Sequence, residues 1–156
     1  MQAYTDYLAL LETLSEHLEQ LTEAALEKAA AVRGDDLMAL DRILNREQAL
    51  ALTFRGLEQK RLKLLSDMGL GDVPLHALAE QYPPELRLQT RKTVEALQRQ
   101  YQVYKSAAEV ARNTLEINLH EIEKLLDANG GVQPSGAGYA RPDAEPPSNM
   151  KTDIRV

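Results

Sequence analysis

The chain of 156 residues contains no cysteine and no tryptophan, and its only other aromatic residues are six tyrosines and one phenylalanine. Without cysteine there can be no disulfide, no thiolate metal site and no cysteine nucleophile. Because aromatic side chains are scarce, the core must consist mainly of leucine and alanine, which leaves little material for the walls of a small-molecule pocket. The absence of cysteine also suits the reducing cytoplasm, and we expect a cytoplasmic protein.

The sequence also lacks long apolar runs and an excess of basic charge. No stretch approaches the roughly 20 apolar residues of a membrane-spanning helix, and the first residues have neither the basic start nor the apolar core of a signal peptide. The formal net charge is −6, whereas binders of nucleic acid or of anionic membranes carry basic surfaces. We therefore expect a protein that neither inserts into a membrane nor binds nucleic acid.

Motifs for catalysis and cofactor binding are missing as well. The sequence has no Gly-x-Gly-x-x-Gly, no phosphate-binding Gly-Lys-Ser/Thr loop and no Gly-x-Ser-x-Gly elbow. None of His17, His76 and His120 follows a glutamate by three residues, as a di-iron bundle requires. Glu116 and His120 can share a helical face, but two ligands alone make a weak metal site. The sequence thus predicts no enzyme, no cofactor and no metal.

Leucines and alanines recur at steps of three and four residues, the period of one face of an α-helix. Gly34 ends the first such segment, and Asp35 or Asp36 can cap the next one, which runs to Gly69. The first stripe consists of Tyr4, Leu8, Leu11, Leu14, Leu18, Leu21, Ala25, Ala29 and Val32. The second consists of Leu37, Leu40, Leu44, Ala51, Phe54, Leu57, Leu62 and Leu65. Because the connection is so short, these two helices should lie antiparallel.

A short piece, residues 73–82, follows, with Leu75 and Leu78 as a small apolar face. Two prolines then break the chain, and Pro84 suits the first turn of a third helix that runs to about Asp127. We predict an all-α fold, an elongated antiparallel bundle of three long helices plus one short helix. Residues 1–128 should form the bundle domain, and residues 129–156, rich in glycine and proline, a flexible tail.

The third helix carries two apolar stripes where a helix at the edge of a bundle needs one. The first stripe contains Val94, Leu97, Tyr101, Tyr104, Ala108, Ala111, Leu115, Leu119, Ile122 and Leu126. The second contains Val103, Ala107, Val110, Thr114, Ile117 and Leu125. Wide apolar surface suggests a partner, and we assign the part from Val110 onward to it. The alternative is that the second stripe packs against residues 73–82 or against a second copy of the chain.

Two runs in the second segment carry a family resemblance. Residues 40–50 read Leu-Asp-Arg-Ile-Leu-Asn-Arg-Glu-Gln-Ala-Leu, and residues 57–65 read Leu-Glu-Gln-Lys-Arg-Leu-Lys-Leu-Leu. With a long last helix and a tail containing Gly138-Tyr139, the chain resembles the FlgN-type flagellar export chaperones over roughly residues 4–139. It departs from the family in its tail, where Tyr139 is followed by Ala-Arg-Pro instead of a glycine-containing turn.

The resemblance implies a chaperone that binds flagellar hook-associated proteins, which form the hook–filament junction. It would prevent their premature assembly and deliver them to the type III export gate, whose components are further possible partners. The client-binding residues would be Val110, Leu115, Ile117, Leu119, Ile122, Leu125 and Leu126, while Tyr139 would contact the export machinery. A self-associating helical module with no client is the alternative, and the oligomeric state stays open at this point.

Overall fold

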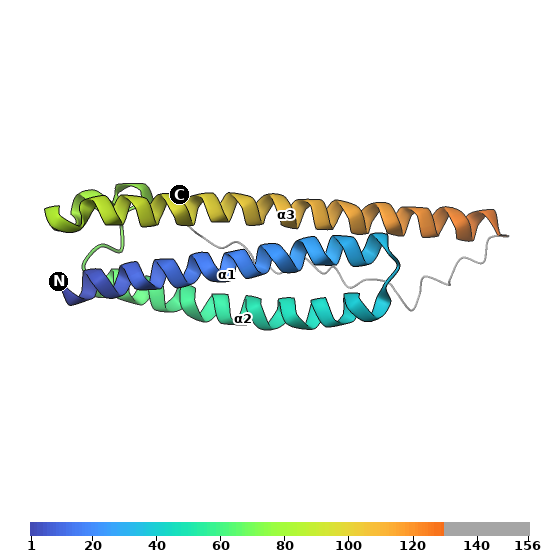
Figure 1. Cartoon of the computed structure of the whole chain (residues 1–156), viewed down its shortest axis with the longest axis horizontal. Coiled ribbons are helices and arrows are strands. Elements are labelled where there is room, and N and C mark those ends of the chain that lie inside the picture. Colours follow the sequence, from blue (N-terminus) through green and yellow to red (C-terminus); the bar gives the residue numbers. More distant parts are fainter. Residues whose placement is uncertain (130–156) are drawn as a thin grey trace.

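A computed structural model describes residues 1–129 of the chain (Figure 1). Its helices are α1 (Gln2–Arg33), α2 (Leu37–Asp67) and α3 (Arg87–Ala128). Two short 3₁₀ helices, η1 (Leu75–Gln81) and η2 (Pro84–Leu86), connect α2 to α3. No strand occurs within residues 1–129, so the predicted all-α bundle of three long helices with a short additional helix is confirmed. The predicted tail lies almost wholly outside the described residues.

The turn between α1 and α2 forms as its sequence predicts. Gly34 follows α1 directly, and its N–H donates to Ala30 O at 3.0 Å. Asp35 then adopts a positive φ of 52°, which aspartate tolerates better than most residues. The carboxylate of Asp36 accepts a hydrogen bond from Ala39 N at 3.0 Å and so caps α2. The chain therefore reverses within three residues, and α1 and α2 pack antiparallel.

α1 is the central helix of the bundle. It packs against both α2 and α3, which have few contacts with each other (Figure 1). Its entire predicted stripe is buried or half-buried, and Tyr7, Leu10 and Ala24 are buried as well. A helix with neighbours on two sides needs this wider apolar surface. The first segment, and not the third, is therefore the one whose broad apolar surface the bundle uses on two sides.

α1 and α3 run parallel to each other in a constant register. The Tyr82 hydroxyl donates to Tyr4 O at 3.1 Å, and Gln100 Nε2 donates to Thr22 Oγ1 at 3.5 Å. Both pairs are separated by 78 residues. A small-residue contact continues the register toward the end of α1, where Ala25 and Ala29 pack with Ala107 and Ala111. This register fixes which part of α3 lies beside α1.

The predicted stripe of α2 is correct in part. Phe54 and Leu65 are buried, and Leu40, Ala51 and Leu57 are half-buried. In contrast, Leu37, Leu44 and Leu62 are exposed, so their predicted place in the core is wrong. The contact face also includes Ile43 and two charged residues, Glu47 and Arg61, which interrupt its apolar period.

The segment between α2 and α3 closes one end of the bundle. Leu75 and Leu78 of η1 are buried, as their spacing predicts, in the same cluster as Val94 and Leu97 of α3. Tyr82 is fully enclosed, and its ring meets the ring of Tyr4 edge-on with centroids 4.6 Å apart. This end of the molecule is thus tightly packed, at the start of α3 and far from its C-terminal end.

Candidate functional site

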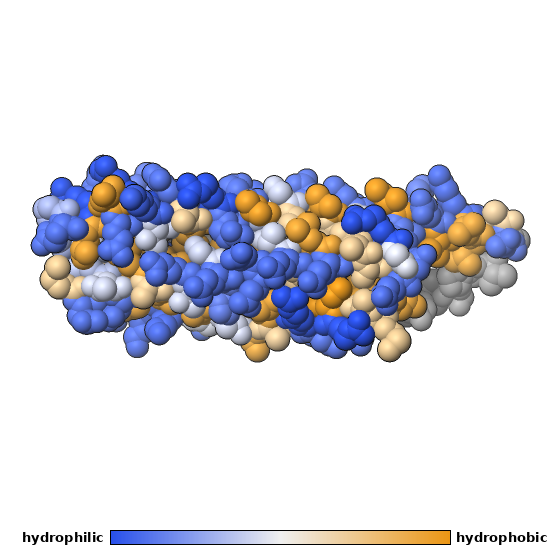
Figure 2. All heavy atoms as spheres, in the orientation of Figure 1, coloured by the Kyte–Doolittle hydropathy of each residue, from blue (hydrophilic) through white to orange (hydrophobic). Residues whose placement is uncertain are grey.

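The C-terminal part of α3 extends beyond the turn between α1 and α2 (Figure 1). Ala107 and Ala111 pack with Ala25 and Ala29 near the end of α1, and α3 leaves the bundle over residues 112–128. Thr114, Leu115 and Asn118 are still half-buried, and every described residue from Leu119 onward is exposed. At about 1.5 Å per residue this overhang is about 25 Å long. Figure 2 shows hydrophobic side chains on it, past the end of the α1–α2 pair. It is the candidate functional site.

Most of the predicted partner-binding residues are exposed apolar side chains on or next to the overhang. Those with large exposed fractions are Val110 (48%), Ile117 (61%), Leu119 (54%), Ile122 (46%), Leu125 (63%) and Leu126 (44%). Leu115 is half-buried. Several large apolar side chains clustered on one short helical stretch make a surface that favours binding to another protein. Tyr139, the eighth predicted residue, lies outside the described residues.

Burial along α3 decreases where α1 ends. Val94 and Leu97 are 5% and 1% exposed, and Ala111 is completely buried. From Leu115 onward the same helical face becomes half-buried and then exposed. The first stripe therefore packs in the bundle over residues 94–108. The apolar period itself does not change at this point, so the exposure reflects the length of α1 and not a new pattern in α3.

The second stripe of α3 does not pack against residues 73–82. Val103, Val110, Ile117 and Leu125 are all exposed. η1 instead contacts the opposite end of α3, because the prolines after Tyr82 turn the chain directly into that helix. The alternative of internal packing against 73–82 is therefore wrong, and no other part of residues 1–129 covers the apolar side chains exposed from Val110 onward.

The polar side chains of the overhang lean toward negative charge. Arg112 Nε and Glu116 Oε1 form an ion pair of 3.2 Å, so Glu116 pairs with the arginine and not with His120. Glu121, Glu123 and Asp127 are exposed, against a single further cation, Lys124. Exposed ion pairs contribute at most about 1 kcal/mol each. Binding to this surface must therefore come mainly from its apolar side chains.

A buried polar cluster, which the sequence patterns did not reveal, joins α1 to α2. Arg61 is 5% exposed and donates to both carboxylate oxygens of Glu58, at 2.8 and 3.1 Å, and to the Tyr7 hydroxyl at 3.2 Å. Burial raises the pKa of Tyr7, and the neighbouring guanidinium opposes this rise. Burial also disfavours the charged form of Arg61, but Glu58 outweighs that effect and raises the pKa of Arg61 above its usual value. In the sequence, the three-residue spacing between Glu58 and Arg61 is the only feature that indicates this ion pair.

A cavity of about 270 Å³ lies next to this cluster, between α1, α2 and the start of η1. Tyr7, Glu58 and Arg61 form its polar wall, and Leu65 and Leu78 belong to its apolar wall. The positive charge of Arg61 is already neutralised by Glu58 through two hydrogen bonds. The cluster therefore holds two helices together and presents no free charge to a ligand.

A second polar contact crosses the middle of the bundle. Lys28 Nζ of α1 and Glu47 Oε1 of α2 form an ion pair of 2.8 Å, in which both side chains are largely buried. The other carboxylate oxygen, Oε2, is buried without a hydrogen-bond partner among the described residues. Burial, followed by the negative charge of Glu47, raises the pKa of Tyr104 on α3. Glu47 thus lies at the junction of all three long helices.

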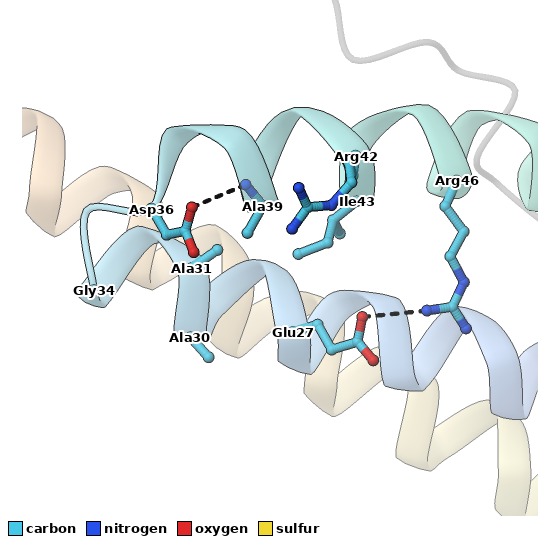
Figure 3. A pocket seen from close by; sticks show the side chains of 9 residues that line it. All are labelled: Glu27, Ala30, Ala31, Gly34, Asp36, Ala39, Arg42, Ile43 and Arg46. Atoms are coloured by element: carbon cyan, nitrogen blue, oxygen red, sulfur yellow. Dashed lines mark hydrogen bonds and ion pairs between the residues drawn. The ribbon is translucent and has the colours of Figure 1, made fainter.

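An open pocket of about 640 Å³ lies beside the turn between α1 and α2 (Figure 3). Alanines from both helices and Ile43 form its floor, and charged side chains surround it. Arg46 donates to Glu27 Oε2 at 3.2 Å across the pocket, and the Asp36 carboxylate is used for capping (Figure 3). Glu27 pairs with Arg46, and Asp36 is occupied by its cap, so the pocket has the chemistry of a helix–helix groove.

The described residues contain no cluster that suggests metal or membrane chemistry. Within residues 1–129, no three His, Asp or Glu side chains are grouped so that they could hold a metal ion. None of the helices in that range combines the length and apolar character that crossing a bilayer needs. The exposed apolar surface of the overhang therefore remains the most distinctive feature of the molecule.

Comparison with known families agrees with this architecture. The model of the FlgN protein family matches residues 1–142, which include the bundle, the overhang and Tyr139. No curated protein and no solved structure matches the chain. The family match spans far more than half of the sequence, and FlgN proteins are a family of chaperones. The chain belongs to the FlgN family and is a flagellar export chaperone.

Proposed function

We propose that this chaperone binds hook-associated proteins, the subunits of the hook–filament junction, through the exposed apolar surface of the overhang. It keeps them unassembled in the cytoplasm and delivers them to the flagellar type III export gate. The observation that carries this proposal is the series of exposed apolar residues between Val110 and Leu126, on a helix that extends beyond the end of α1.

The physical basis is masking of a surface that would otherwise assemble. A client segment that forms an amphipathic helix can lay its apolar face on the overhang, in the manner of helix-in-groove recognition. Binding removes free client from the assembly equilibrium by mass action, and no nucleotide is needed for that effect. The bundle also stays folded when no client is bound, because the side chains of the overhang contribute little to the core.

Tyr139 has a separate role in this proposal. It lies eleven residues after Ala128, the last residue of α3, and is the one aromatic residue of residues 130–156. A tyrosine side chain offers a large contact area at low entropic cost. We assign it to contact with components of the export gate, while the overhang holds the client.

The test replaces two apolar residues of the overhang by charges. Leu119→Asp combined with Ile122→Asp should reduce binding of hook-associated proteins at least about 100-fold, because two buried contacts would be replaced by two desolvated charges. Isothermal titration calorimetry with each purified hook-associated protein measures the loss, and circular dichroism checks that helicity is retained. Loss of helicity would mean that the overhang belongs to the core.

A matched control places the same charges on exposed leucines elsewhere. Leu26 of α1 and Leu52 of α2 are 51% and 69% exposed, so Leu26→Asp with Leu52→Asp should leave binding unchanged. Equal binding by the overhang variant and the control would contradict the assignment of the client to the overhang. Tight self-association of the purified chain, with no complex to any hook-associated protein, would instead favour a self-assembling module.

A further inference from the structure

The start of α2 carries leucines that the bundle leaves largely uncovered. Leu37 and Leu44 are 76% and 41% exposed, and Leu40 between them is half-buried. Steps of three and four residues place all three on one side of the helix. Large apolar side chains that share one exposed helical face favour contact with a partner. These three residues, the α2 leucines, form a short apolar strip at the beginning of the helix.

The α2 leucines lie on the side of α2 that is turned toward η1 and α3. Leu44 and Leu62 are 18 residues apart, which is five full helical turns, so both have the same direction. Leu62 lines the cavity between α1, α2 and η1, and η1 packs against α3. Arg42 and Arg46 lie almost opposite Leu44 around the helix and line a different pocket (Figure 3). The strip therefore faces the side of the bundle that carries α3.

The α2 leucines also reach the level at which α3 leaves the bundle. Glu47 pairs with Lys28 of α1, and burial followed by the charge of Glu47 raises the pKa of Tyr104 on α3. These three residues therefore lie at one level. From there α2 and α3 run in opposite directions, so Leu37, ten residues before Glu47, lies near the level of Leu115. Figure 1 shows the start of α2 at the end of the bundle where α3 projects.

The overhang presents the same face that α3 uses inside the bundle. At 100° per residue this face consists of Leu97, Tyr101, Ala108, Leu115, Leu119 and Leu126. One helix placed along the line of α1 would therefore cover the exposed leucines of the overhang. The α2 leucines lie beside the beginning of that line, because α2 packs against α1 and Leu37 follows Gly34 of the turn by only three residues.

The overhang alone is small for a stable complex. A standard interface takes about 20–30 residues from each partner, whereas a single helical neighbour meets only part of residues 112–128. We infer that one amphipathic helix of the client lies on the overhang along the line of α1 and packs its end near the turn against the α2 leucines. The client site then has two walls, one from α3 and one from the start of α2.

This inference rests on the proposed function, because it adds a second contact to the client site. A helix of the client is the occupant that the positions favour. It continues the α1–α3 contact into the overhang, and it meets the α2 leucines without a bend, because they lie beside the same line. Leu37, Leu40 and Leu44 would then be partner-binding residues, although their regular spacing predicts a place in the core.

Charges on the two exposed α2 leucines should disrupt this contact. Leu37→Asp with Leu44→Asp should weaken binding of a purified hook-associated protein at least about 10-fold, because apolar contacts would be replaced by desolvated charges. Leu52→Asp is the matched control and should bind like the unchanged chain. Leu52 is 69% exposed and lies nine residues, or two and a half turns, after the buried Ile43, on the outer side of α2. Isothermal titration calorimetry measures the affinities, and circular dichroism measures helicity.

Because the chain has no cysteine, single cysteines give a second measurement without background. Leu37→Cys and Leu119→Cys are each labelled with a photoactivatable crosslinker, irradiated in complex with the hook-associated protein and mapped by mass spectrometry. Both should cross-link to one helical segment of the client, and Leu52→Cys should give no cross-link to it. These variants decide the question if the charged variant loses helicity.

Unchanged affinity of the charged variant with helicity retained would overturn this inference and leave the proposed function standing. Cross-links to the client from Leu119→Cys alone would have the same meaning. Cross-links from Leu37→Cys to a second copy of the chain, to residues 130–156 or to a different segment of the client would overturn it as well. If the unchanged chain forms no complex with any hook-associated protein, the proposed function fails and this inference fails with it.

Discussion

The two halves of α3 have the same apolar period but opposite surroundings. In the first half, from Val94 to Ala111, the first stripe is buried or half-buried beside α1. In the second half, Leu119, Ile122 and Leu126 continue that stripe and are exposed. The period of apolar residues in a sequence therefore indicates only that a helix needs an apolar neighbour. Whether that neighbour comes from the same chain depends on where the other helices end.

The most direct way to test this comparison is to remove one leucine from each half. Leu97 is 1% exposed and Leu119 is 54% exposed. Leu97→Ala should lower the free energy of unfolding by about 2–5 kcal/mol, because it creates a cavity in the core. Leu119→Ala should change it by less than about 0.5 kcal/mol. Urea denaturation followed by circular dichroism measures both, and equal losses would show that the overhang is part of the core.

The boundary between the two halves can be tested at the alanine contact. Ala111 is fully buried against Ala25 and Ala29, so Ala111→Leu should overpack the site and cost about 1–3 kcal/mol. Ala128→Leu adds the same side chain at the exposed end of α3 and should have almost no effect. Thermal unfolding of the two variants compares them. A neutral Ala111→Leu would mean that α1 and α3 separate before this point.

A smaller effect concerns pH, which should act on the bundle half alone. Burial raises the pKa of Tyr82 above its usual value, and the overhang contains no tyrosine. Since the pKa in the folded state exceeds that of the unfolded chain, about 10, this contribution to stability is fully present below pH 10. It decreases above that pH by up to about 1.4 kcal/mol per pH unit.

The Tyr82→Phe variant isolates this contribution. Between pH 9 and 11 its stability, measured by urea denaturation, should fall less steeply than that of the unchanged chain. Tyr7→Phe provides a second comparison, because burial also raises the pKa of Tyr7. Parallel slopes for all three proteins would indicate that these tyrosines ionise at their ordinary pKa in the folded chain, which would contradict the tight packing at this end of the bundle.

Much of the bundle could be predicted from residues that favour a single local backbone structure. Gly34 and Asp36 specify the turn, since one ends a helix and the other caps the next. The leucines of α1 were placed correctly because α1 has neighbours on two sides and nearly any apolar position on it is buried. The family was likewise predicted from the runs in α2, although their leucines are not all in the core.

Only part of the contact face of α2 could be predicted from the sequence. That helix packs mainly against α1, and its contact face contains Glu47 and Arg61. Both are compatible with burial only because Lys28 and Glu58 lie within hydrogen-bonding distance. Such pairing depends on the three-dimensional register of two helices. A pattern of apolar residues therefore favoured the regular leucines at positions 37, 44 and 62, which are exposed.

The extent of the overhang was also beyond the sequence pattern. A long third helix predicts that some part of it projects or bends, but the point where it leaves the bundle depends on its register with α1. That register is set at the opposite end of the molecule, where Tyr82 meets Tyr4. The exposure of the residues from Leu115 onward therefore depends on the contact of Tyr82, which lies more than thirty residues earlier in the sequence.

Thr22 of α1 and its partner Gln100 of α3 are 78 residues apart in the sequence, and this separation has a consequence for the order of folding. Closing the three-residue turn between α1 and α2 costs little chain entropy, whereas joining α1 to α3 closes a far longer loop, at an additional cost of roughly 3 kcal/mol. We expect the α1–α2 hairpin to form first and α3 to pack against it last. A newly synthesised chain would thus form its α1–α2 hairpin before α3, which carries the overhang, packs against it.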